Sequence, residues 1–421
     1  MRVSMPATLP AAFTLGMMST TEQREGANAR ALTVIDVPAG PASIDALWEP
    51  IDEALRGGPA IALVPQVSPL TPLAVTEAIR AGVQPAWPVA SDTAVVLSTS
   101  GSTGQPRGVC LSASALTVFA GNVNDLAGGD PTWVLAIPPT SVGGLNVMIR
   151  ARATGRRPIA VASVGGADRF TDVAFAAAVD AAATQGQPVA VSLVPTQLPR
   201  LLETSLGRRA LADCSLILVG GAALTPQAAQ DCASAGISIT TTYGMTETSG
   251  GCILNGSPLP GVEVRLDDTD GRIFLSGPML ASGYRDGANE AFTDGWLRTQ
   301  DRGRWVDGDL QILGRLDDVV LIKGVNVDLV AVEDRASDHP LISSTIAVAA
   351  NDDDEARVHL IYTGEVVELN DIADWIAETL GSPAIPTAIH RVESFNLTSS
   401  GKVDRRGTAA QLGLELFADE L

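Results

Sequence analysis

The sequence is poor in the residues that build metal and disulfide sites. It contains 4 cysteines and 3 histidines in 421 residues. The cysteines form no C-x-x-C pair, and His339, His359 and His390 all lie late in the chain, so neither a zinc site nor a disulfide framework is predicted. Because no G-x-S-x-G motif occurs and no histidine lies earlier, the sequence also argues against a serine hydrolase.

Long hydrophobic runs are absent as well. No stretch of about 18 apolar residues occurs, which predicts no membrane span. The apolar stretch at residues 5–18 is broken by two prolines, and Arg2 is the only charge before it. We therefore expect no signal peptide and a cytoplasmic protein.

Positive charge is scarce. The chain has 28 Lys and Arg residues against 48 Asp and Glu residues, which gives a formal net charge of −20. This balance opposes binding to nucleic acid or to an anionic membrane surface. An anionic small molecule would need local basic groups, and Arg107, Lys323 and Lys402 stand out because lysine is so rare here.

The run S-T-S-G-S-T-G-Q-P-R-G at residues 98–108 is the most informative motif that is present. Glycines let consecutive N–H groups turn toward one point, and such a nest binds an anion, while the hydroxyls add donors and Arg107 adds charge. An apolar strand is expected at residues 93–97, so the run follows a strand end, where α/β sheets usually bind ligands. Taken alone, an ordinary Ser/Gly/Thr surface loop explains the composition equally well.

Residues 93–245 alternate between apolar strand candidates and helix candidates, a pattern typical of an α/β domain with a largely parallel sheet. Strands are expected at 93–97, 133–137, 189–194, 216–219 and 238–241, and helices at 113–127, 171–184 and 226–235. Loops at 138–144, 220–223 and 242–251 follow strand ends. In one parallel sheet they would open onto the same edge as the run at 98–108.

The remainder of the chain changes character twice. Residues 259–313 show short strands and Asp-Gly turns, which predict a small β-rich subdomain. After residue 314, strand candidates at 319–322, 345–349 and 358–362 and helices near 329–337 and 371–380 predict a separate α+β domain. The first ninety residues are Ala/Pro-rich with a few helical stretches.

We therefore expect an α/β protein of two domains. The large N-terminal domain, residues 1–314, would contain mostly parallel sheets flanked by helices, with the β-rich subdomain at its end. A short charged junction at 315–318 would connect it to a small α+β domain at 319–421.

A second motif, T-T-Y-G-M-T-E-T at residues 241–248, follows a strand candidate. Tyr243 can pack on a base, Thr246 can bond a phosphate, and Glu247 can hold Mg²⁺, which prefers oxygen ligands. A polar strand-to-loop turn is the alternative for this motif alone.

Seven motifs in order resemble those of the AMP-forming acyl-CoA synthetases, which share their fold with adenylation domains and luciferases. The resemblance runs from about residue 93 to residue 405. Besides the two runs above it includes V-G-G-A-A-L at 219–224, S-G-P-M-L-A-S-G-Y at 276–284, D-G-W-L-R-T-Q-D at 294–301, G-R-L-D-D at 314–318 and S-G-K-V-D-R at 400–405. Each motif alone is weak, but seven in family order make coincidence implausible.

The resemblance implies a nucleotide site. The residues expected to bind ATP or AMP are Ser100, Gly101, Ser102, Thr103, Gly104, Arg107, Gly220, Gly221, Ala222, Tyr243, Gly244, Thr246, Asp301 and Arg315. Asp301 would bind the ribose hydroxyls, since a carboxylate accepts two hydrogen bonds from a diol. Thr246, Glu247 and Lys402 would be catalytic, Glu247 would also hold Mg²⁺, and Asp317 would be the hinge.

The implied reaction joins a carboxylic acid to coenzyme A with ATP and Mg²⁺. An acyl-adenylate and pyrophosphate form first, and thiol attack then releases AMP. Lys402 suits the first step, because a positioned ammonium relieves the repulsion between a carboxylate and the α-phosphate. In this family the small C-terminal domain is mobile and rotates about the hinge between the two halves.

Two stretches resemble one branch of the family, the o-succinylbenzoate–CoA ligases of menaquinone (vitamin K2) biosynthesis, especially their short actinobacterial form. These are Y-G-M-T-E-T-S-G-G-C at 243–252 with P-L-P-G-V-E-V-R-L after it, and A-I-P-P-T-S-V-G-G-L-N-V-M-I-R-A at 136–151. The acid would be an aromatic dicarboxylate, so a second anion-binding group is expected, and Arg150 is the candidate, although it can equally be a surface residue. The residues expected near the acid are Ser141, Gly143, Arg150, Thr248 and Ser249.

Four positions depart from the family pattern. Arg107 replaces the usual lysine, Ser141 a frequent histidine and Gln300 a glycine, and the segment around Gly324 differs. Another acyl- or aryl-CoA ligase, a stand-alone adenylation domain that loads a carrier protein, and a non-catalytic nucleotide-binding protein remain alternatives. We expect small-molecule partners (ATP, coenzyme A and the acid) and no nucleic acid, and a homodimer is left open.

Overall fold

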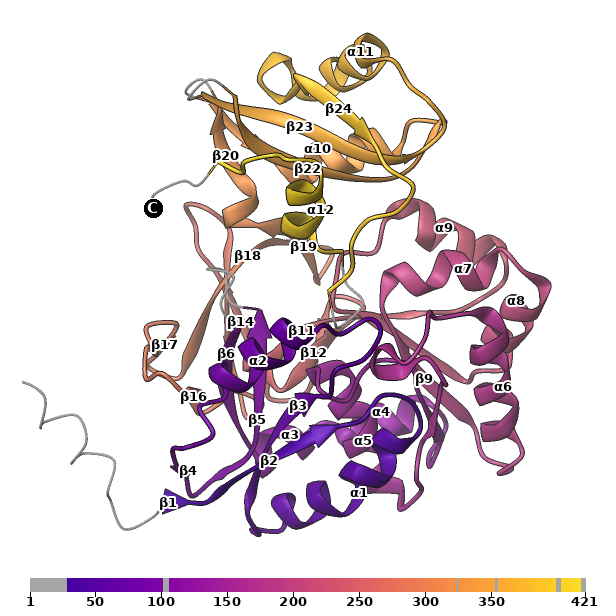
Figure 1. Cartoon of the computed structure of the whole chain (residues 1–421), viewed down its shortest axis with the longest axis vertical. Helices are drawn as coiled ribbons and strands as arrows, with labels where there is room; N and C mark the ends of the chain where they lie inside the picture. The colour runs from indigo at the N-terminus through magenta and orange to yellow at the C-terminus, as the bar shows by residue number, and fades with distance from the viewer. Residues whose placement is uncertain (1–28, 101–105, 323–324, 353–354, 399–402, 418–421) are drawn as a thin grey trace, which may run out of the picture.

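The computed structural model describes residues 29–100, 106–322, 325–352, 355–398 and 403–417. Gly101, Ser102, Thr103, Gly104, Gly324 and Lys402, all named above, lie outside these residues. The chain forms a large lower part and a smaller upper part, which begins after residue 318 (Figure 1). Its mixture of sheets and helices confirms the α/β class.

The large part contains two sheets that lie in different layers. The first has the order β16 (Gly283–Tyr284), β6 (Pro106–Ser112), β5 (Thr93–Ser100), β3 (Ala60–Pro65), β2 (Leu32–Val37). The second has the order β13 (Ser257–Pro258), β12 (Gly250–Leu254), β11 (Thr240–Met245), β10 (Leu216–Gly220), β9 (Val189–Leu193), β7 (Thr132–Leu135), β8 (Ile159–Ala160). A small pair, β1 (Ala29–Arg30) with β4 (Val89–Ala90), stands apart.

The expectation that the run at 98–108 opens onto the same sheet edge as the later loops is wrong. Strand β5 belongs to the first sheet, whereas β7, β9, β10 and β11 are parallel neighbours in the second. Both ends of the run are strand rather than loop, because β5 ends at Ser100 and β6 begins at Pro106, paired antiparallel to it.

Helices fill the layers around these sheets. A shared core joins both sheets through the helices between them, α1 (Ala42–Leu55), α3 (Ala113–Thr117), α4 (Ala120–Leu126) and α5 (Val142–Thr154). Helix α2 (Leu73–Gly82) covers the outer face of the first sheet. A second core lies under α6 (Asp172–Ala183), α7 (Leu198–Leu202), α8 (Ser205–Ala212) and α9 (Pro226–Ser234), at the right of Figure 1. The predicted helix 113–127 is divided into α3 and α4 at Phe119, whose backbone leaves the helical conformation.

The β-rich subdomain is an antiparallel sheet of β14 (Glu263–Leu266), β15 (Arg272–Ser276), β17 (Phe292–Thr293), β18 (Trp296–Val306) and β19 (Asp309–Arg315). An Asp-Gly turn joins β18 to β19, and Asp307 takes a left-handed conformation there with φ of 52°. The segment between β15 and β17 crosses to the first sheet as β16. This crossing brings residues 283–288 beside β6.

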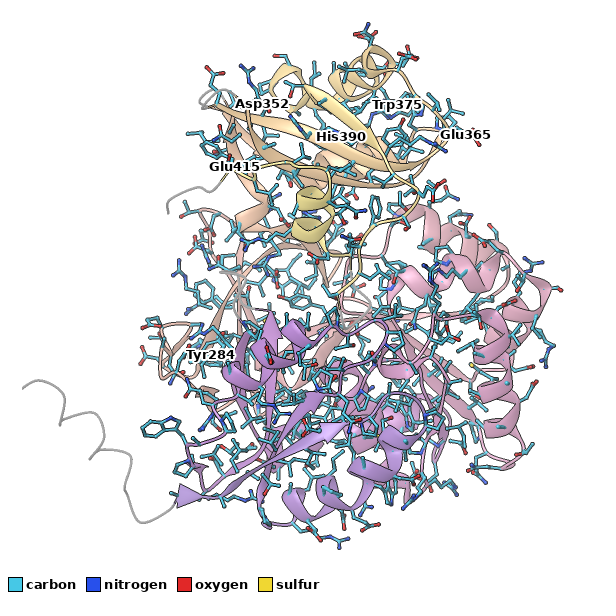
Figure 2. All side chains as sticks on the ribbon, in the orientation of Figure 1. Tyr284, Asp352, Glu365, Trp375, His390 and Glu415 are labelled. Carbon is cyan, nitrogen blue, oxygen red and sulfur yellow. The ribbon has the colours of Figure 1, made fainter. Side chains whose placement is uncertain are left out.

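The upper part has its own core. It contains the hairpin β20 (Val319–Ile322) and β21 (Val325–Asp328), the sheet β22 (Ile342–Asp352), β23 (Glu355–Gly364) and β24 (Ala388–Arg391), and the helices α10 (Leu329–Ser337), α11 (Leu369–Leu380) and α12 (Arg405–Gln411). Figure 2 places the labelled Trp375 and His390 there and Tyr284 in the large part. Among the described residues, no helix is long and apolar enough to cross a membrane.

Arg285 ties β16 to the chain beyond α2. It is 6% exposed, and its guanidinium donates hydrogen bonds to the carbonyls of Val83, Gln84, Trp87 and Pro88. The bond to Val83 is buried and the other three are partly buried, so carbonyls that lose this donor carry a desolvation cost. The side chain therefore holds the crossing segment against the first sheet.

We expect Arg285→Met to lower the free energy of unfolding by about 3 kcal/mol, because four buried or partly buried carbonyls lose a charged donor. Urea denaturation followed by far-UV circular dichroism measures the change. Arg298→Met, at an exposed position of β18, is the matched control and should change stability by no more than about 0.5 kcal/mol. Equal stability of the two variants would contradict this role for Arg285.

Candidate active site

The segment from Tyr243 to Ser249 is the backbone around which the candidate site is arranged. Strand β11 ends at Met245, and a short 3₁₀ turn, Thr246–Thr248, follows. Gly244 allows β11 and β12 to meet closely, since a Cβ there would lie 2.1 Å from the carbonyl oxygen of Gly250. The turn thus leaves the sheet at a position that has no room for a larger residue.

On one side of this segment, Tyr243 and Asp301 join two sheets. The Tyr243 hydroxyl donates to Asp301 Oδ2 at 2.7 Å, and Arg315 Nη1 lies 3.6 Å from Asp301 Oδ1. Burial, and then the neighbouring Asp301 charge, hold the pKa of Tyr243 well above its usual value, so the hydroxyl remains a donor. Arg315 also donates two hydrogen bonds to Asp317, at 2.7 and 2.6 Å.

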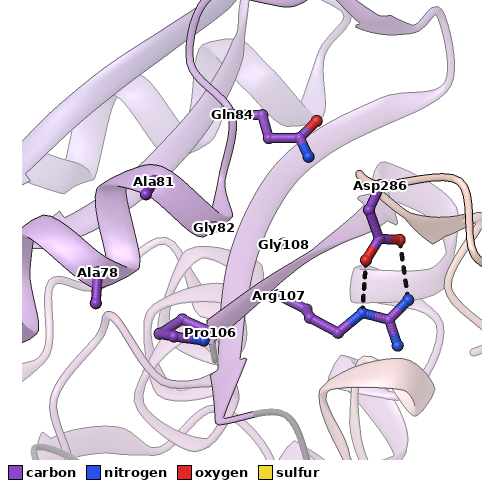
Figure 3. A pocket seen from close by; sticks show the side chains of 8 residues that line it. All are labelled: Ala78, Ala81, Gly82, Gln84, Pro106, Arg107, Gly108 and Asp286. Carbon is purple, nitrogen blue, oxygen red and sulfur yellow. Dashed lines mark hydrogen bonds and ion pairs between the residues drawn. The ribbon is translucent and has the colours of Figure 1, made fainter. Parts of the chain in front are cut away.

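On the other side of this segment, Glu247 contacts Tyr284, and the Arg107 guanidinium stacks on the Tyr284 ring. Its Oε1 accepts a hydrogen bond from the Tyr284 hydroxyl at 2.9 Å, and the Arg107 guanidinium lies 3.8 Å from the centre of the Tyr284 ring. Arg107 donates through Nε and Nη2 to the two oxygens of Asp286, at 2.7 and 2.9 Å (Figure 3). Its Nη2 also donates to the carbonyl of Ala288. The bond to Asp286 raises the pKa of Arg107, which stays charged.

Arg107 and Asp286 also line a hollow of about 260 Å³ beside α2. In Figure 3 its wall is formed by Ala78, Ala81, Gly82, Gln84, Pro106 and Gly108. Both glycines are sterically required, because a Cβ on Gly82 would lie 2.4 Å from the Pro106 carbonyl oxygen and one on Gly108 would lie 2.6 Å from the Arg285 side chain. The close approach of α2 and β6 holds the strand that carries Arg107.

Arg150 is a buried residue of α5, so its interpretation as a surface residue is wrong. It is 6% exposed, its Nη1 lies 3.5 Å from Ser192 Oγ, and its guanidinium lies 5.3 Å from the Trp133 ring. Burial lowers its pKa to about 10, and no carboxylate of the described residues forms an ion pair with it. A buried cation is costly without an anion, so the site is suited to receive one.

A hydrogen bond holds α5, which carries Arg150, to the turn that contains Glu247. Asn146 donates from Nδ2 to the Ser249 carbonyl at 2.7 Å, which joins α5 to the turn. The Thr248 hydroxyl bonds to Met245 and Gly250 within the turn, so its hydroxyl supports the turn itself. Ser249 takes φ of 52°, and its Oγ is buried without a partner among the described residues.

Ser141 and the neighbouring glycine lie at the start of α5. The Ser141 hydroxyl accepts from Gly144 N at 3.4 Å and donates to the Pro138 carbonyl at 2.7 Å, so it caps the helix. Gly143 has ordinary space around it, since a Cβ there would lie 3.5 Å from Ile137 Cδ1. Both residues border the carboxyl end of β7.

The glycine motif after β10 lies next to β11. A Cβ on Gly220 would be 2.1 Å from Thr242 Oγ1, and Gly221 takes φ of 85°. Ala222 is exposed. Ser100 ends β5, where its backbone pairs with Pro106, and the neighbouring Ser98 has a buried Oγ without a partner among the described residues.

Three residues that sequence reasoning missed complete these contacts. Tyr284 ends the S-G-P-M-L-A-S-G-Y motif, so its position carried a signal. Asn146 lies in the stretch at 136–151, but its partner Ser249 is distant in the chain, so its role was not predicted. Asp286 lies outside the motifs, and its partner Arg107 is also distant.

Arg405 anchors the start of α12 to the junction. It donates to Asp318 Oδ1 at 3.2 Å and to Glu333 Oε2 at 2.7 Å. Glu333 Oε1 also accepts from Ala347 N at 2.8 Å, yet burial raises the pKa of Glu333 to about 7. The chain just after Lys402 is therefore bound to the junction and to α10.

Among the described residues, no group of three or more His, Cys, Asp and Glu side chains could hold a metal ion. Glu247 is a single carboxylate within reach of Tyr284 and beside the Arg107 guanidinium. One carboxylate suits Mg²⁺ that is held mainly by phosphate and water. It does not suit a metal that requires a closed protein cage.

Comparison with known proteins gives the following relationships. The family model described as AMP-binding enzyme matches residues 22–285. The chain is 34% identical over 399 residues to the probable 2-succinylbenzoate–CoA ligase of Mycobacterium tuberculosis strain H37Rv, covering 89% of this chain and 97% of that protein. It is 28% identical over 349 residues to the 2-succinylbenzoate–CoA ligase of Bacillus cytotoxicus, covering 75% of this chain and 69% of that protein.

Solved structures share the fold. The o-succinylbenzoate CoA synthetase of Bacillus subtilis, in complex with its acyl-adenylate intermediate, has a TM-score of 0.68 at 20% identity and covers 89% of this chain and 87% of its own. An ATP-bound RpMatB-BxBclM chimera has a TM-score of 0.73 at 19% identity and covers 93% of this chain and 91% of its own.

Because the pKa of Glu333 is raised in the folded protein, its contribution to stability is greatest below pH 4.5 and is lost as the pH rises through about 7. Between pH 5 and pH 8 we expect the wild-type free energy of unfolding to fall by about 2 kcal/mol more than that of Glu333→Gln. Urea denaturation across this range measures the difference. Glu365→Gln, at an exposed position of the same part of the chain, should follow the wild type, and parallel profiles for all three proteins would contradict the prediction.

Proposed function

Because this chain belongs to the AMP-binding enzyme family, we propose that it ligates 2-succinylbenzoate to coenzyme A through an acyl-adenylate, with release of AMP and pyrophosphate, as a step of menaquinone biosynthesis. The observation that carries the choice of acid is Arg150, a buried cation with no carboxylate partner among the described residues. The relative from Mycobacterium tuberculosis, which the chain matches along 97% of its length, supports the same acid.

The nucleotide would bind along β11 and β18. We assign the ribose hydroxyls to Asp301, whose carboxylate is oriented by the Tyr243 hydroxyl and by Arg315. The adenine would lie beside Gly220, Gly221 and Ala222. A left-handed glycine at residue 221 lets the backbone approach a flat ring closely.

The phosphates would lie toward Glu247 and β6. We assign residues 100–104 and Arg107 to the β- and γ-phosphates, and Thr246 to the phosphate that reacts. Arg107 is held through Nε and Nη2, which leaves its remaining edge for a phosphate oxygen. The Tyr284 ring beneath the guanidinium keeps this edge in place.

Glu247 fits the task of holding Mg²⁺ that arrives with ATP, and bound Mg²⁺ would supply charge neutralisation between the phosphates. Tyr284 orients the Glu247 carboxylate by donating to one oxygen and leaving the other free to accept or ligate. The turn at 246–248 therefore presents a fixed carboxylate next to the phosphates.

Adenylate formation requires two anions to meet. We assign Lys402 to the relief of this repulsion, since an ammonium on a flexible stem can follow the redistributed charge. Residues 315–318, with Asp317 as the hinge, would let the C-terminal residues 319–421 rotate so that coenzyme A reaches the adenylate. The same proposal includes the domain boundaries, with residues 1–314 as the N-terminal domain and residues 319–421 as the C-terminal domain.

The acid would occupy the space between the turn and α5. Its reacting carboxylate would face Thr246, and its second carboxylate would pair with Arg150. Ser249 has a buried hydroxyl available to the acid, whereas Ser141, Gly143 and Thr248 would shape the wall. An aromatic acid without the second carboxylate would leave the Arg150 charge unpaired, which is a basis for selectivity.

The experiment is AMP release with ATP, Mg²⁺ and coenzyme A across a panel of 2-succinylbenzoate, benzoate, 2-ethylbenzoate and fatty acids. We expect 2-succinylbenzoate to have the highest kcat/KM, and Lys402→Ala to serve as the negative control. A faster fatty or simple aryl acid would identify another acyl-CoA ligase. Transfer to a phosphopantetheine protein but not to coenzyme A would identify a carrier-loading adenylation domain.

Arg150→Met should raise the KM for 2-succinylbenzoate at least tenfold, since the second carboxylate loses its partner, and should leave turnover of monocarboxylic acids unchanged. The fold should tolerate it, because replacing an unpaired buried charge with an apolar residue removes a desolvation cost. Steady-state kinetics and thermal melting test both points. Arg152→Met, on the same helix but paired with Asp52, is the control for a nearby lost charge. An unchanged KM in Arg150→Met would refute the assignment.

Asp286→Asn should raise the KM for ATP about threefold to tenfold, because Arg107 loses the charged partner that holds its orientation. The KM for the acid should not change. Asp45 forms a direct ion pair with Arg157, away from the proposed site. Asp45→Asn is therefore the control and should leave the KM for ATP and the KM for the acid unchanged. If Asp286→Asn behaves like Asp45→Asn in steady-state kinetics, Asp286 does not position Arg107.

A further inference from the structure

Arg302 and Asp328 form an ion pair that spans the junction at 315–318. Arg302 lies on β18 of the β-rich subdomain, and Asp328 ends β21 in the C-terminal part. Their side chains are 22% and 26% exposed, so solvent only partly screens the attraction. The pair holds the two parts of the chain directly, without passing through the junction.

The Asp328 carboxylate is fixed from its own side. Its Oδ1 accepts hydrogen bonds from Val330 N at 3.0 Å and Ala331 N at 3.4 Å, so it caps α10. Its Oδ2 is left for Arg302. Because Asp328 caps α10, the carboxylate that contacts Arg302 moves together with α10.

Arg302 depends on this contact. Its Nε is buried and has no hydrogen-bond partner among the described residues. If Asp328 moves away, a half-buried guanidinium loses its carboxylate, which is unfavourable. Separation of the two parts therefore costs free energy at this position. The ion pair favours the arrangement in which Arg302 and Asp328 are in contact.

The position of Arg302 in the strand couples this contact to the nucleotide site. It directly follows Asp301, and successive residues of a strand face opposite sides. Asp301 faces Tyr243 and Arg315, while Arg302 faces Asp328. One short piece of β18 therefore holds both the proposed ribose ligand and the C-terminal part.

We propose that Arg302 and Asp328 form an interdomain latch that favours the orientation of residues 319–421 seen here and must open between the two half-reactions. Arg302 is a positioning residue in this role. The proposal rests on the proposed function, because only a reaction in two halves requires the C-terminal part to change position. Opening the latch changes the ratio of the two half-reaction rates, since each half uses one orientation.

The test measures each half-reaction separately. Adenylate formation is followed by pyrophosphate release without coenzyme A, and thioester formation by single turnover of preformed acyl-adenylate with coenzyme A. Arg302→Met and Asp328→Asn should each change the ratio of these rates about threefold to tenfold in the same direction, and the double variant should change it no further. An unchanged ratio, or single effects that add in the double variant, would overturn the proposal.

Matched variants separate the latch from helix capping and from general loss of charge. Asparagine caps helices well, so Asp328→Asn should keep the melting temperature, whereas Asp328→Ala loses both cap and latch. Arg302→Lys keeps the positive charge and should retain most of the wild-type ratio of the two half-reaction rates. Arg304→Met, on the same strand with its bond to Gln311 inside the subdomain, should leave the ratio unchanged.

A readout without substrate distinguishes failure of the latch from failure of the proposed function. In the free protein, amide hydrogen exchange at residues 303–315 and 325–328 should be at least threefold faster in Arg302→Met than in the wild type, while residues 342–364 stay unchanged. This result would support the latch even if 2-succinylbenzoate were not the substrate. Unchanged exchange at the junction would overturn the latch whatever acid the protein uses.

Discussion

The hydrogen bond between Tyr243 and Asp301 is the contact on which the proposed site depends. It joins β11 of the second sheet to β18 of the β-rich subdomain, and Asp301 in turn faces Arg315 at the end of β19. Burial raises the pKa of Tyr243, so the phenol stays protonated and donates to the carboxylate. Three separate segments therefore present one oriented carboxylate beside the junction, and the geometry does not depend on any single loop.

Charge pairing explains how an acidic chain can handle anions. The formal net charge is −20, and several arginines of the described residues pair with a carboxylate, as Arg107 does with Asp286 and Arg315 with Asp317. Such partners orient the guanidinium, and at Arg107 they leave one edge for a ligand. Arg150 differs, because it is buried with a serine hydroxyl and a tryptophan ring beside it and forms no ion pair with a carboxylate of the described residues. A paired cation such as Arg107 suits a phosphate that binds and is released in each turnover. A buried cation without a carboxylate, such as Arg150, suits selection of one substrate.

Local pattern predicted much of the fold. The alternation of apolar strands and helices is found in the second sheet, and α10 begins and ends where the pattern indicated. The pattern failed at strand pairing, because β5 and β11 were expected at one sheet edge and belong to two sheets. Alternation of apolar residues reports whether a segment is buried, and buried strands of both sheets look alike. It also did not show that the run at 98–108 has strand at both ends, because a Gly/Ser/Thr-rich composition indicates a loop, whereas residues 98–100 pair with residues 106–108 of the same run.

The sequence by itself determined the kind of chemistry: a glycine- and hydroxyl-rich run, a Tyr–Thr–Glu turn, an aspartate and a late lysine in family order. Only the tertiary structure decided which charges meet. Arg107 and Asp286 are 179 positions apart, and Arg302 finds Asp328 across the junction at a separation of 26. Residue type and local spacing set what a side chain can do, but the crossing of β16 to the first sheet and the approach of β21 to β18 set its partner. The crossing of β16 follows from burial of distant apolar segments in a shared core. Strands β21 and β18 belong to separate cores and meet through the ion pair itself. No short motif encodes either arrangement.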